Sequence, residues 1–172
     1  MPHTTPYICS TLSTMKLIFS LKSLSGLLAA LFIISVSACS TSTSKQTAPS
    51  SSAVVAIKHA KAQIGVHYKY GGNSPASGFD CSGLIQYSYK QAGIRLPHST
   101  KQLYKITQRV DKDDLRPGDL VFFKINRRKI SHVGIYLGNN RFVHAPSTGK
   151  RVNIASLDLN YWKKRFSRGG RF

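Results

Sequence analysis

Acidic residues are the scarcest charged side chains in this 172-residue sequence. It contains no glutamate and only six aspartates, against 25 lysines and arginines, which gives a formal net charge of +19. So few carboxylates argue against a metal centre built from acidic ligands and against a hydrolase that uses paired carboxylates. The basic excess predicts an anionic partner without identifying it. The length fits one domain, and a hydrophobic fraction of 41% is sufficient for a core.

Cysteine is also scarce, since three residues exclude a scaffold held by several disulfides. The first 38 residues (1–38) carry the pattern of a signal peptide, in which two lysines precede an apolar run too short for a comfortable membrane span. We expect translation to start at Met15. Residues 36–39 (VSAC) resemble the lipobox of bacterial lipoproteins, in which the cysteine, here Cys39, is lipidated. An ordinary cleaved signal peptide with a chance cysteine is the alternative.

The segment after this cysteine is rich in serine and threonine and has little to bury. Residues 39–52 are therefore expected to be lipidated Cys39 and a flexible tether, and residues 53–172 a single folded domain. The lipoprotein resemblance, with Ser40 after the cysteine, implies a lipid anchor in the outer membrane of a Gram-negative type bacterium, facing the periplasm.

Helical patterns come first in the predicted domain, and strand patterns follow. Apolar spacing predicts a helix over 54–64, while Asp80 and Ser99 are expected to cap helices that run to about residues 92 and 107. Beyond a Pro-Gly turn, the period changes to that of strands. The expected strands cover residues 119–123, 132–137, 142–145 and 151–154. This order predicts an α+β fold with an antiparallel sheet.

The apolar pattern of the two middle strands indicates their register. A three-residue loop, 138–140, sets Leu137 opposite Arg141 and gathers the apolar side chains on one face. The other face then carries both His132 and His144. A two-residue turn would break both sets, because a slip of one residue exchanges the faces.

Cys81 has no expected disulfide partner, because the lipid is assigned to Cys39. It lies in the predicted first turn of a helix, where the macrodipole stabilises a thiolate, although a buried and inert cysteine is the alternative. A nucleophilic cysteine needs a base and the base needs an orienter, which His132 and His144 would supply. A zinc site of these three residues is a weaker alternative, since no two ligands are closely spaced.

Five segments carry a resemblance to a known family. They are residues 68–72 (YKYGG), 80–83 (DCSG), 115–123 (LRPGDLVFF), 132–136 (HVGIY) and 142–145 (FVHA). In this order they resemble the motifs of the NlpC-type cell-wall peptidases, over about residues 53–165. The Tyr161-Trp162 pair resembles the lipoprotein branch of that family, close to NlpC.

The resemblance implies a papain-like fold, with helices packed on an antiparallel sheet and the nucleophile at a helix N-terminus. It implies a cysteine endopeptidase that hydrolyses peptidoglycan stem peptides or cross-bridges, at D-glutamyl–diaminopimelate or D-alanyl–diaminopimelate bonds, without metal or cofactor. Cys81 would be the nucleophile, His132 the base and His144 the orienter. The family pattern makes Tyr68 a candidate substrate or oxyanion contact. Asp80 and Ser82, which flank the nucleophile, are candidate peptide contacts.

One position departs from the family pattern, because His98 follows Leu-Pro where many relatives have arginine. If that arginine binds a substrate carboxylate, a histidine would do so weakly at neutral pH. A non-catalytic wall-binding lipoprotein is the main alternative. A nucleic-acid binder is disfavoured by the signal and by the spread of the basic residues. The expected partners are peptidoglycan and, through Cys39, a membrane, and the expected oligomeric state is a monomer.

The positive charge gathers in two places near the predicted site. Three basic residues, 127–129, lie before His132, and five lie between residues 163 and 171. We expect this charge to hold the protein against carboxylate-rich peptidoglycan and anionic lipid. A generally solvated basic surface is the alternative.

Overall fold

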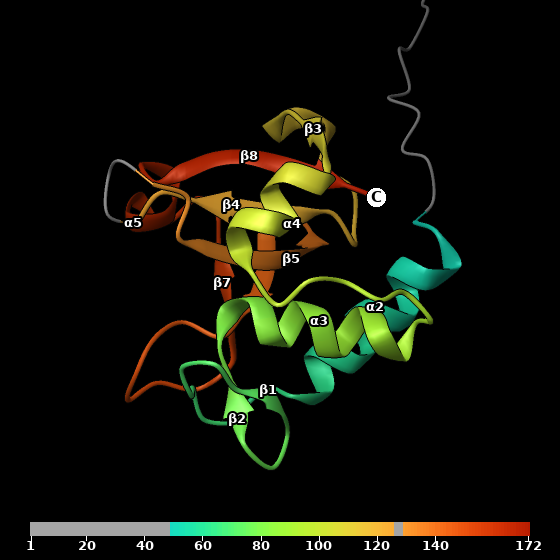
Figure 1. The fold of residues 1–172 in the computed structure, drawn as a ribbon. Helices are drawn as coiled ribbons and strands as arrows, with labels where there is room; N and C mark the ends of the chain where they lie inside the picture. The colour runs from blue at the N-terminus through green and yellow to red at the C-terminus, as the bar shows by residue number, and fades with distance from the viewer. Residues whose placement is uncertain (1–48, 126–128) are drawn as a thin grey trace, which may run out of the picture. The chain divides into compact units, whose positions relative to one another are not determined.

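The computed structural model describes residues 49–125 and 129–172. The predicted signal peptide, Cys39 and most of the predicted tether lie outside the described residues. Helices come first, as expected, and a six-stranded antiparallel sheet follows (Figure 1). None of the described helices combines the length and hydropathy needed to cross a bilayer.

Three helices pack on the sheet through faces of small or apolar residues. A side chain caps the start of each helix. Helix α2 (Ser51–Ala62) begins where the Ser50 hydroxyl accepts a hydrogen bond from the Ala53 N–H, 3.2 Å away, and it buries three alanines. It starts earlier than predicted, so the last two residues assigned to the tether belong to the helix. Helices α3 (Cys81–Gln91) and α4 (Thr100–Ile106) begin after the predicted capping side chains, Asp80 and Ser99.

Every neighbouring pair of strands in the main sheet runs antiparallel, in the order β3-β8-β4-β5-β6-β7. The strands are β3 (Gln108–Val110), β4 (Leu120–Phe123), β5 (His132–Gly138), β6 (Arg141–His144), β7 (Asn153–Ser156) and β8 (Phe166–Arg171). A small second sheet pairs β1 (Asn73–Ser74) with β2 (Gly78–Phe79), and the remaining elements are η2 (Lys112–Asp114) and α5 (Asn160–Lys163).

The β5–β6 hairpin has the predicted faces but not the predicted loop. Ile135 faces Val143, as expected, whereas Gly138 and not Leu137 faces Arg141. The turn consists of Asn139 and Asn140 alone, both with positive φ near 50°. Leu137 is the extra residue of a bulge, which restores the register that a two-residue turn would otherwise shift.

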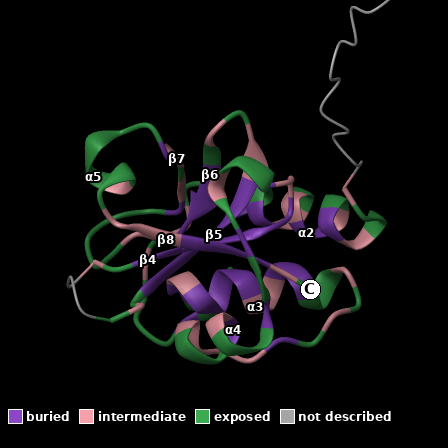
Figure 2. Cartoon of the chain, turned by 90° about the horizontal axis from the view of Figure 1, so that it is seen from above, coloured by how far each residue is buried: buried purple, intermediate pink, exposed green. Residues whose placement is uncertain are grey.

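The sheet separates two apolar clusters. One face of β4–β6 contributes Val133, Ile135 and Val143 to the core beneath α2, α3 and α4. The other face contributes Phe123, Tyr136 and Phe142 to a smaller cluster that includes Trp162 and Phe166. Figure 2 shows buried residues concentrated on the central strands and on the side of α3 toward them.

Strand β8 was not predicted, although it lies inside the sheet. Its sequence, FSRGGR, lacks alternating apolar residues, and Gly169 and Gly170 are typical of a loop. Both glycines are needed here because a Cβ at either one would collide with neighbouring side chains, including those of Leu115 and Phe122. Strand β7 is also shifted from the predicted 151–154, since Arg151 forms only an isolated bridge with His67.

Two of the five C-terminal basic residues are not available as surface charge. Arg168 is buried, with its guanidinium 3.9 Å from the centroid of the Tyr104 ring, and it donates to the backbone carbonyls of Tyr104 and Thr107. Arg171 pairs with the buried carboxylate of Asp119 at 2.6 Å. These two arginines therefore stabilise the fold, and the expected basic cluster is smaller than the sequence indicates.

Candidate active site

Cys81 is the first residue of α3, and the Asp80 carboxylate organises the backbone around it. This carboxylate accepts hydrogen bonds from the Gly83 N–H at 2.7 Å and from the Gly71 N–H at 2.9 Å, which ties the helix start to the loop that carries Tyr68. The Ser82 hydroxyl also donates to it at 3.0 Å, and His98 Nε2 lies at the same distance. Asp80 and Ser82 thus lie beside Cys81 with their polar groups engaged inside the protein.

The Cys81 thiol is half-buried between α4 and the start of β5. Its Sγ lies 3.5 Å from Thr100 Oγ1, while no hydrogen bond joins it to His132 among the described residues. Burial raises the pKa of the thiol, and the Asp80 charge acts in the same direction. Hydrogen bonds from Thr100 and from the backbone of Val133 oppose this increase in pKa. Burial thus opposes the thiolate that the helix N-terminus favours.

The two predicted histidines meet on one face of the sheet. His132 begins β5, His144 ends β6, and His132 Nε2 lies 2.8 Å from His144 Nδ1. Both side chains are almost fully buried, at 4% and 2% exposure. Gly134 makes this approach possible, because a Cβ there would lie 2.6 Å from the Phe142 ring and 3.3 Å from the His144 Cβ. The predicted pairing of the histidines is confirmed.

Burial keeps both imidazoles neutral. It lowers the pKa of His132, and the neighbouring His144 lowers it further. Burial also lowers the pKa of His144, whereas the Asn153 side chain raises that pKa and the Lys150 charge lowers it. Asn153 faces His144 across the β6–β7 ladder, and its amide nitrogen donates to Arg151 O at 2.9 Å. The amide oxygen of Asn153 is thus left to accept from His144.

Trp162, in α5, forms a wall of the histidine pair. Its ring stacks on His132 with a centroid distance of 5.5 Å and an angle of 26°, and it meets His144 edge-on at 4.9 Å. The sequence interpretation used Trp162 only as a family marker and missed Thr100 and Asn153. The ladder position of Asn153 opposite His144 could have indicated its role, but β7 was predicted two residues too early.

Tyr68 lies near the thiol, as its candidate role requires. Burial raises the pKa of its hydroxyl most, and the nearby Cys81 and Asp80 raise this pKa further. The Tyr68 N–H donates to Lys150 O at 2.8 Å, which ties this loop to the β6–β7 connection. The structure therefore brings Tyr68, Cys81, His132 and His144 to one region. Within residues 49–125 and 129–172, no three His, Cys, Asp or Glu side chains are arranged to hold a metal.

The buried, neutral histidine pair predicts a loss of stability in mild acid. Both pKa values lie below the ordinary 6.5, so the unfolded chain binds more protons than the folded one as the pH falls below about 6.5. We expect the unfolding free energy to fall by roughly 3 kcal/mol between pH 6.5 and pH 5, about half of it from each histidine, and the melting temperature by at least about 5 °C. Thermal melts would measure this. His144→Asn should weaken the pH dependence, the control His59→Asn should not, and a flat profile in the wild type would contradict it.

Known proteins are similar to this chain in sequence and in fold. The NlpC/P60 family matches residues 65–171. The chain is 45% identical over 108 residues to murein DD-endopeptidase MepS/murein LD-carboxypeptidase of Escherichia coli K12, which covers 62% of this chain and 56% of that one. It is 41% identical over 126 residues to gamma-DL-glutamyl hydrolase of Bacillus subtilis. This match covers 72% of this chain and 30% of the relative.

A crystal structure of a lipoprotein-like NLP/P60 protein from Staphylococcus aureus has a TM-score of 0.65 at 35% identity, over 74% of this chain and 44% of that one. The chain thus spans only 30% and 56% of the two curated relatives. The family match nevertheless includes Tyr68, Cys81 and both histidines. The papain-like fold and this match mean that the chain belongs to the NlpC/P60 family.

Proposed function

We propose that this protein is a cysteine peptidase that hydrolyses peptide bonds in peptidoglycan. The observation that carries the proposal is the buried His132–His144 pair beside a cysteine at a helix N-terminus. The name of one relative, a murein endopeptidase, supports this substrate class, and the name of the other supports hydrolysis of a glutamyl bond.

The hydrogen-bond order favours His132 as the base. If Asn153 accepts the Nε2–H of His144, then His144 Nδ1 accepts the Nε2–H of His132, because a neutral imidazole has one donor and one acceptor nitrogen. This leaves the lone pair of His132 Nδ1 to receive the thiol proton. His144 and Asn153 act as positioning residues in this arrangement.

The reaction then follows from these groups together with an oxyanion site. With the substrate bound, the thiol proton moves to His132 and the sulfur attacks the peptide carbonyl. The Cys81 N–H and the Tyr68 hydroxyl stabilise the oxyanion. The imidazolium gives its proton to the leaving amine as the C–N bond breaks, and water hydrolyses the thioester.

The proposal covers two bonds, D-glutamyl–diaminopimelate within a stem and D-alanyl–diaminopimelate in a cross-bridge. Digestion of purified peptidoglycan by the full chain, with mass analysis of the soluble fragments, tests it. The residue that carries the new C-terminal carboxyl, D-glutamate or D-alanine, identifies the bond, because diaminopimelate supplies the new amine in both cases. Intact peptidoglycan after prolonged digestion, with the protein sedimenting with the walls, would favour the non-catalytic wall-binding alternative.

We also propose that lipid on Cys39 anchors the protein to the outer membrane, with the domain in the periplasm. The lipobox-like residues 36–39 support this proposal. In a Gram-negative host, we expect fatty-acid label on the wild type and none on Cys39→Ala, with Cys81→Ala as the matched control that keeps the label. Equal labelling of wild type and Cys39→Ala would contradict the anchor.

A further inference from the structure

A pocket of about 280 Å³ opens beside His132 and is not used by the chemistry described so far. Trp162, Ile125 and Pro146 supply apolar walls, and Lys150 supplies the charge. Pockets that enclose drug-sized ligands occupy roughly 300–1,000 Å³. This smaller pocket has the dimensions and the lining for one amino-acid residue that carries methylene groups and an anionic end.

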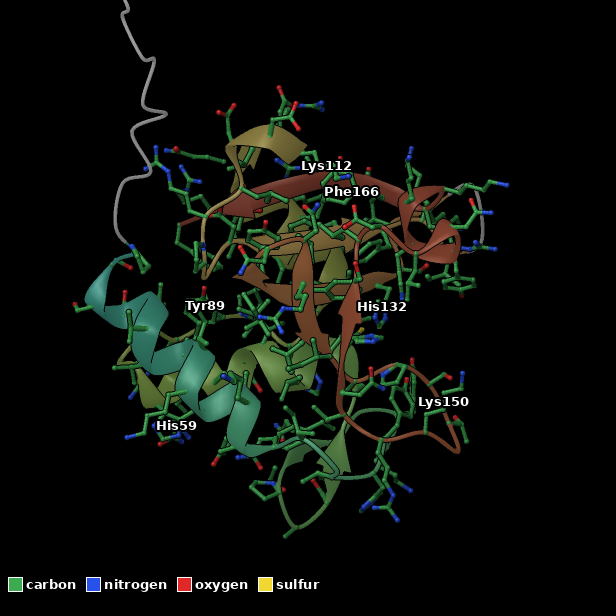
Figure 3. All side chains as sticks on the ribbon, turned by 180° about the vertical axis from the view of Figure 1, so that it is seen from behind. His59, Tyr89, Lys112, His132, Lys150 and Phe166 are labelled. Carbon is green, nitrogen blue, oxygen red and sulfur yellow. The ribbon has the colours of Figure 1, made fainter. Side chains whose placement is uncertain are left out.

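Lys150 is the charged group of this pocket, and its backbone is held on both sides. Its carbonyl accepts from the Tyr68 N–H at 2.8 Å, and its N–H donates to Ser147 O at 3.1 Å. No acidic residue lines the pocket, and no described carboxylate lies within salt-bridge distance of the Lys150 ammonium. Figure 3 shows Lys150 and His132 on the same side of the molecule.

The charge of Lys150 also lies close to the imidazole pair. It is one of the groups that lower the pKa of His144, while the Asn153 side chain acts in the opposite direction. His132 lines the pocket, and Cys81 does not. The pocket therefore adjoins the imidazole that delivers the proton, and not the sulfur that holds the acyl group.

This placement assigns the pocket to the leaving side of the substrate. In the proposed reaction, the acyl half stays on Cys81, and the amine that departs takes its proton from His132. The residue that bears this amine must therefore lie next to the imidazole, where the pocket opens.

We propose that Lys150 binds a free carboxylate on the residue that supplies the leaving amine, an inference that rests on the proposed peptidase function. In a D-alanyl–diaminopimelate cross-bridge, the leaving nitrogen is attached to a carbon that carries such a carboxylate. In a D-glutamyl–diaminopimelate bond inside a longer stem, the corresponding carboxyl is part of the next peptide bond. Lys150 thus favours the cross-bridge, and the apolar walls accommodate the methylene chain of diaminopimelate.

The test compares two soluble cross-linked muropeptides that differ only in this group, which is a carboxylate in one and its primary amide in the other. We expect the full-length wild type to cleave the free acid with a kcat/KM about tenfold higher, as expected for one charge-assisted hydrogen bond. Lys150→Met should bring the ratio of the two kcat/KM values close to one, and Lys150→Arg should preserve the preference. The matched control Lys163→Met removes an exposed charge from α5 and should keep the wild-type ratio.

The possible outcomes separate a failure of the Lys150 carboxylate site from a failure of the proposed peptidase function. Equal cleavage of the two muropeptides by the wild type overturns the carboxylate site and leaves the peptidase function intact, and this comparison needs no variant to fold. A wild-type preference that survives in Lys150→Met overturns the role of Lys150. Cleavage of neither muropeptide by the wild type overturns the proposed function and this inference with it.

Discussion

Replacement of Cys81 by alanine is expected to lower peptidoglycan hydrolysis by at least about 10⁴-fold, because the acyl intermediate can no longer form. The fold should survive, since the helix start is capped by Asp80 and not by the thiol. The variant should keep the wild-type melting temperature within about 2 °C and still sediment with cell walls. Release of the same fragments by both proteins would exclude Cys81 as the nucleophile.

The pKa of Cys81 adds a second readout to this experiment. Because burial raises the pKa of the thiol, alkylation of the resting protein should accelerate steadily toward alkaline pH. A thiolate–imidazolium pair formed in the resting state would instead give a rate that is already level near pH 7. Cys81→Ala serves as the control for reaction elsewhere in the chain.

The second large effect is expected at the histidine pair. His132→Gln removes the group that exchanges the proton, and we expect a loss of roughly 10²–10⁴-fold in kcat. His144→Asn should retain part of the activity, because an amide oxygen can still accept from His132 Nε2, whereas His144→Ala should lose more. Steady-state kinetics on a soluble muropeptide would measure the series.

The controls for this series are available in the same chain. His59→Gln, on α2, changes a histidine outside the site and should leave kcat unchanged. Equal activities of His144→Asn and His144→Ala would show that hydrogen bonding by residue 144 does not orient the base. Wild-type activity in His132→Gln would require another base.

Local chemistry explains why part of the fold was predictable. Asp80 and Ser99 mark helix starts because their side chains accept backbone N–H groups from the first turn. The faces of the β5–β6 hairpin followed from apolar alternation, even though the bulge at Leu137 replaced the expected longer loop. Strand β8 was missed because Gly169 and Gly170 reflect tight packing, which becomes visible only when their neighbours are in place.

At the candidate site, too, some features follow from local sequence and others only from tertiary packing. The place of Cys81 at a helix start and the contact between His132 and His144 could be predicted, because these residues lie at element boundaries with clear sequence patterns. Thr100, Asn153 and Lys150 come from α4, β7 and the loop before β7, and ordinary surface roles explain such residues equally well. Only the assembled sheet shows that they surround the same three side chains.

The candidate site also depends on strand β8. It fills the gap between β3 and β4, and its Arg168 holds the backbone of α4, the helix whose first residue contacts the Cys81 sulfur. A chain that lacks residues 166–171 leaves one edge of β4 without a paired strand. It also lacks the Arg168 hydrogen bonds to the backbone at the end of α4. An organised Cys81 site therefore depends on the last strand of the sheet, although Cys81 itself lies about 85 residues earlier in the chain.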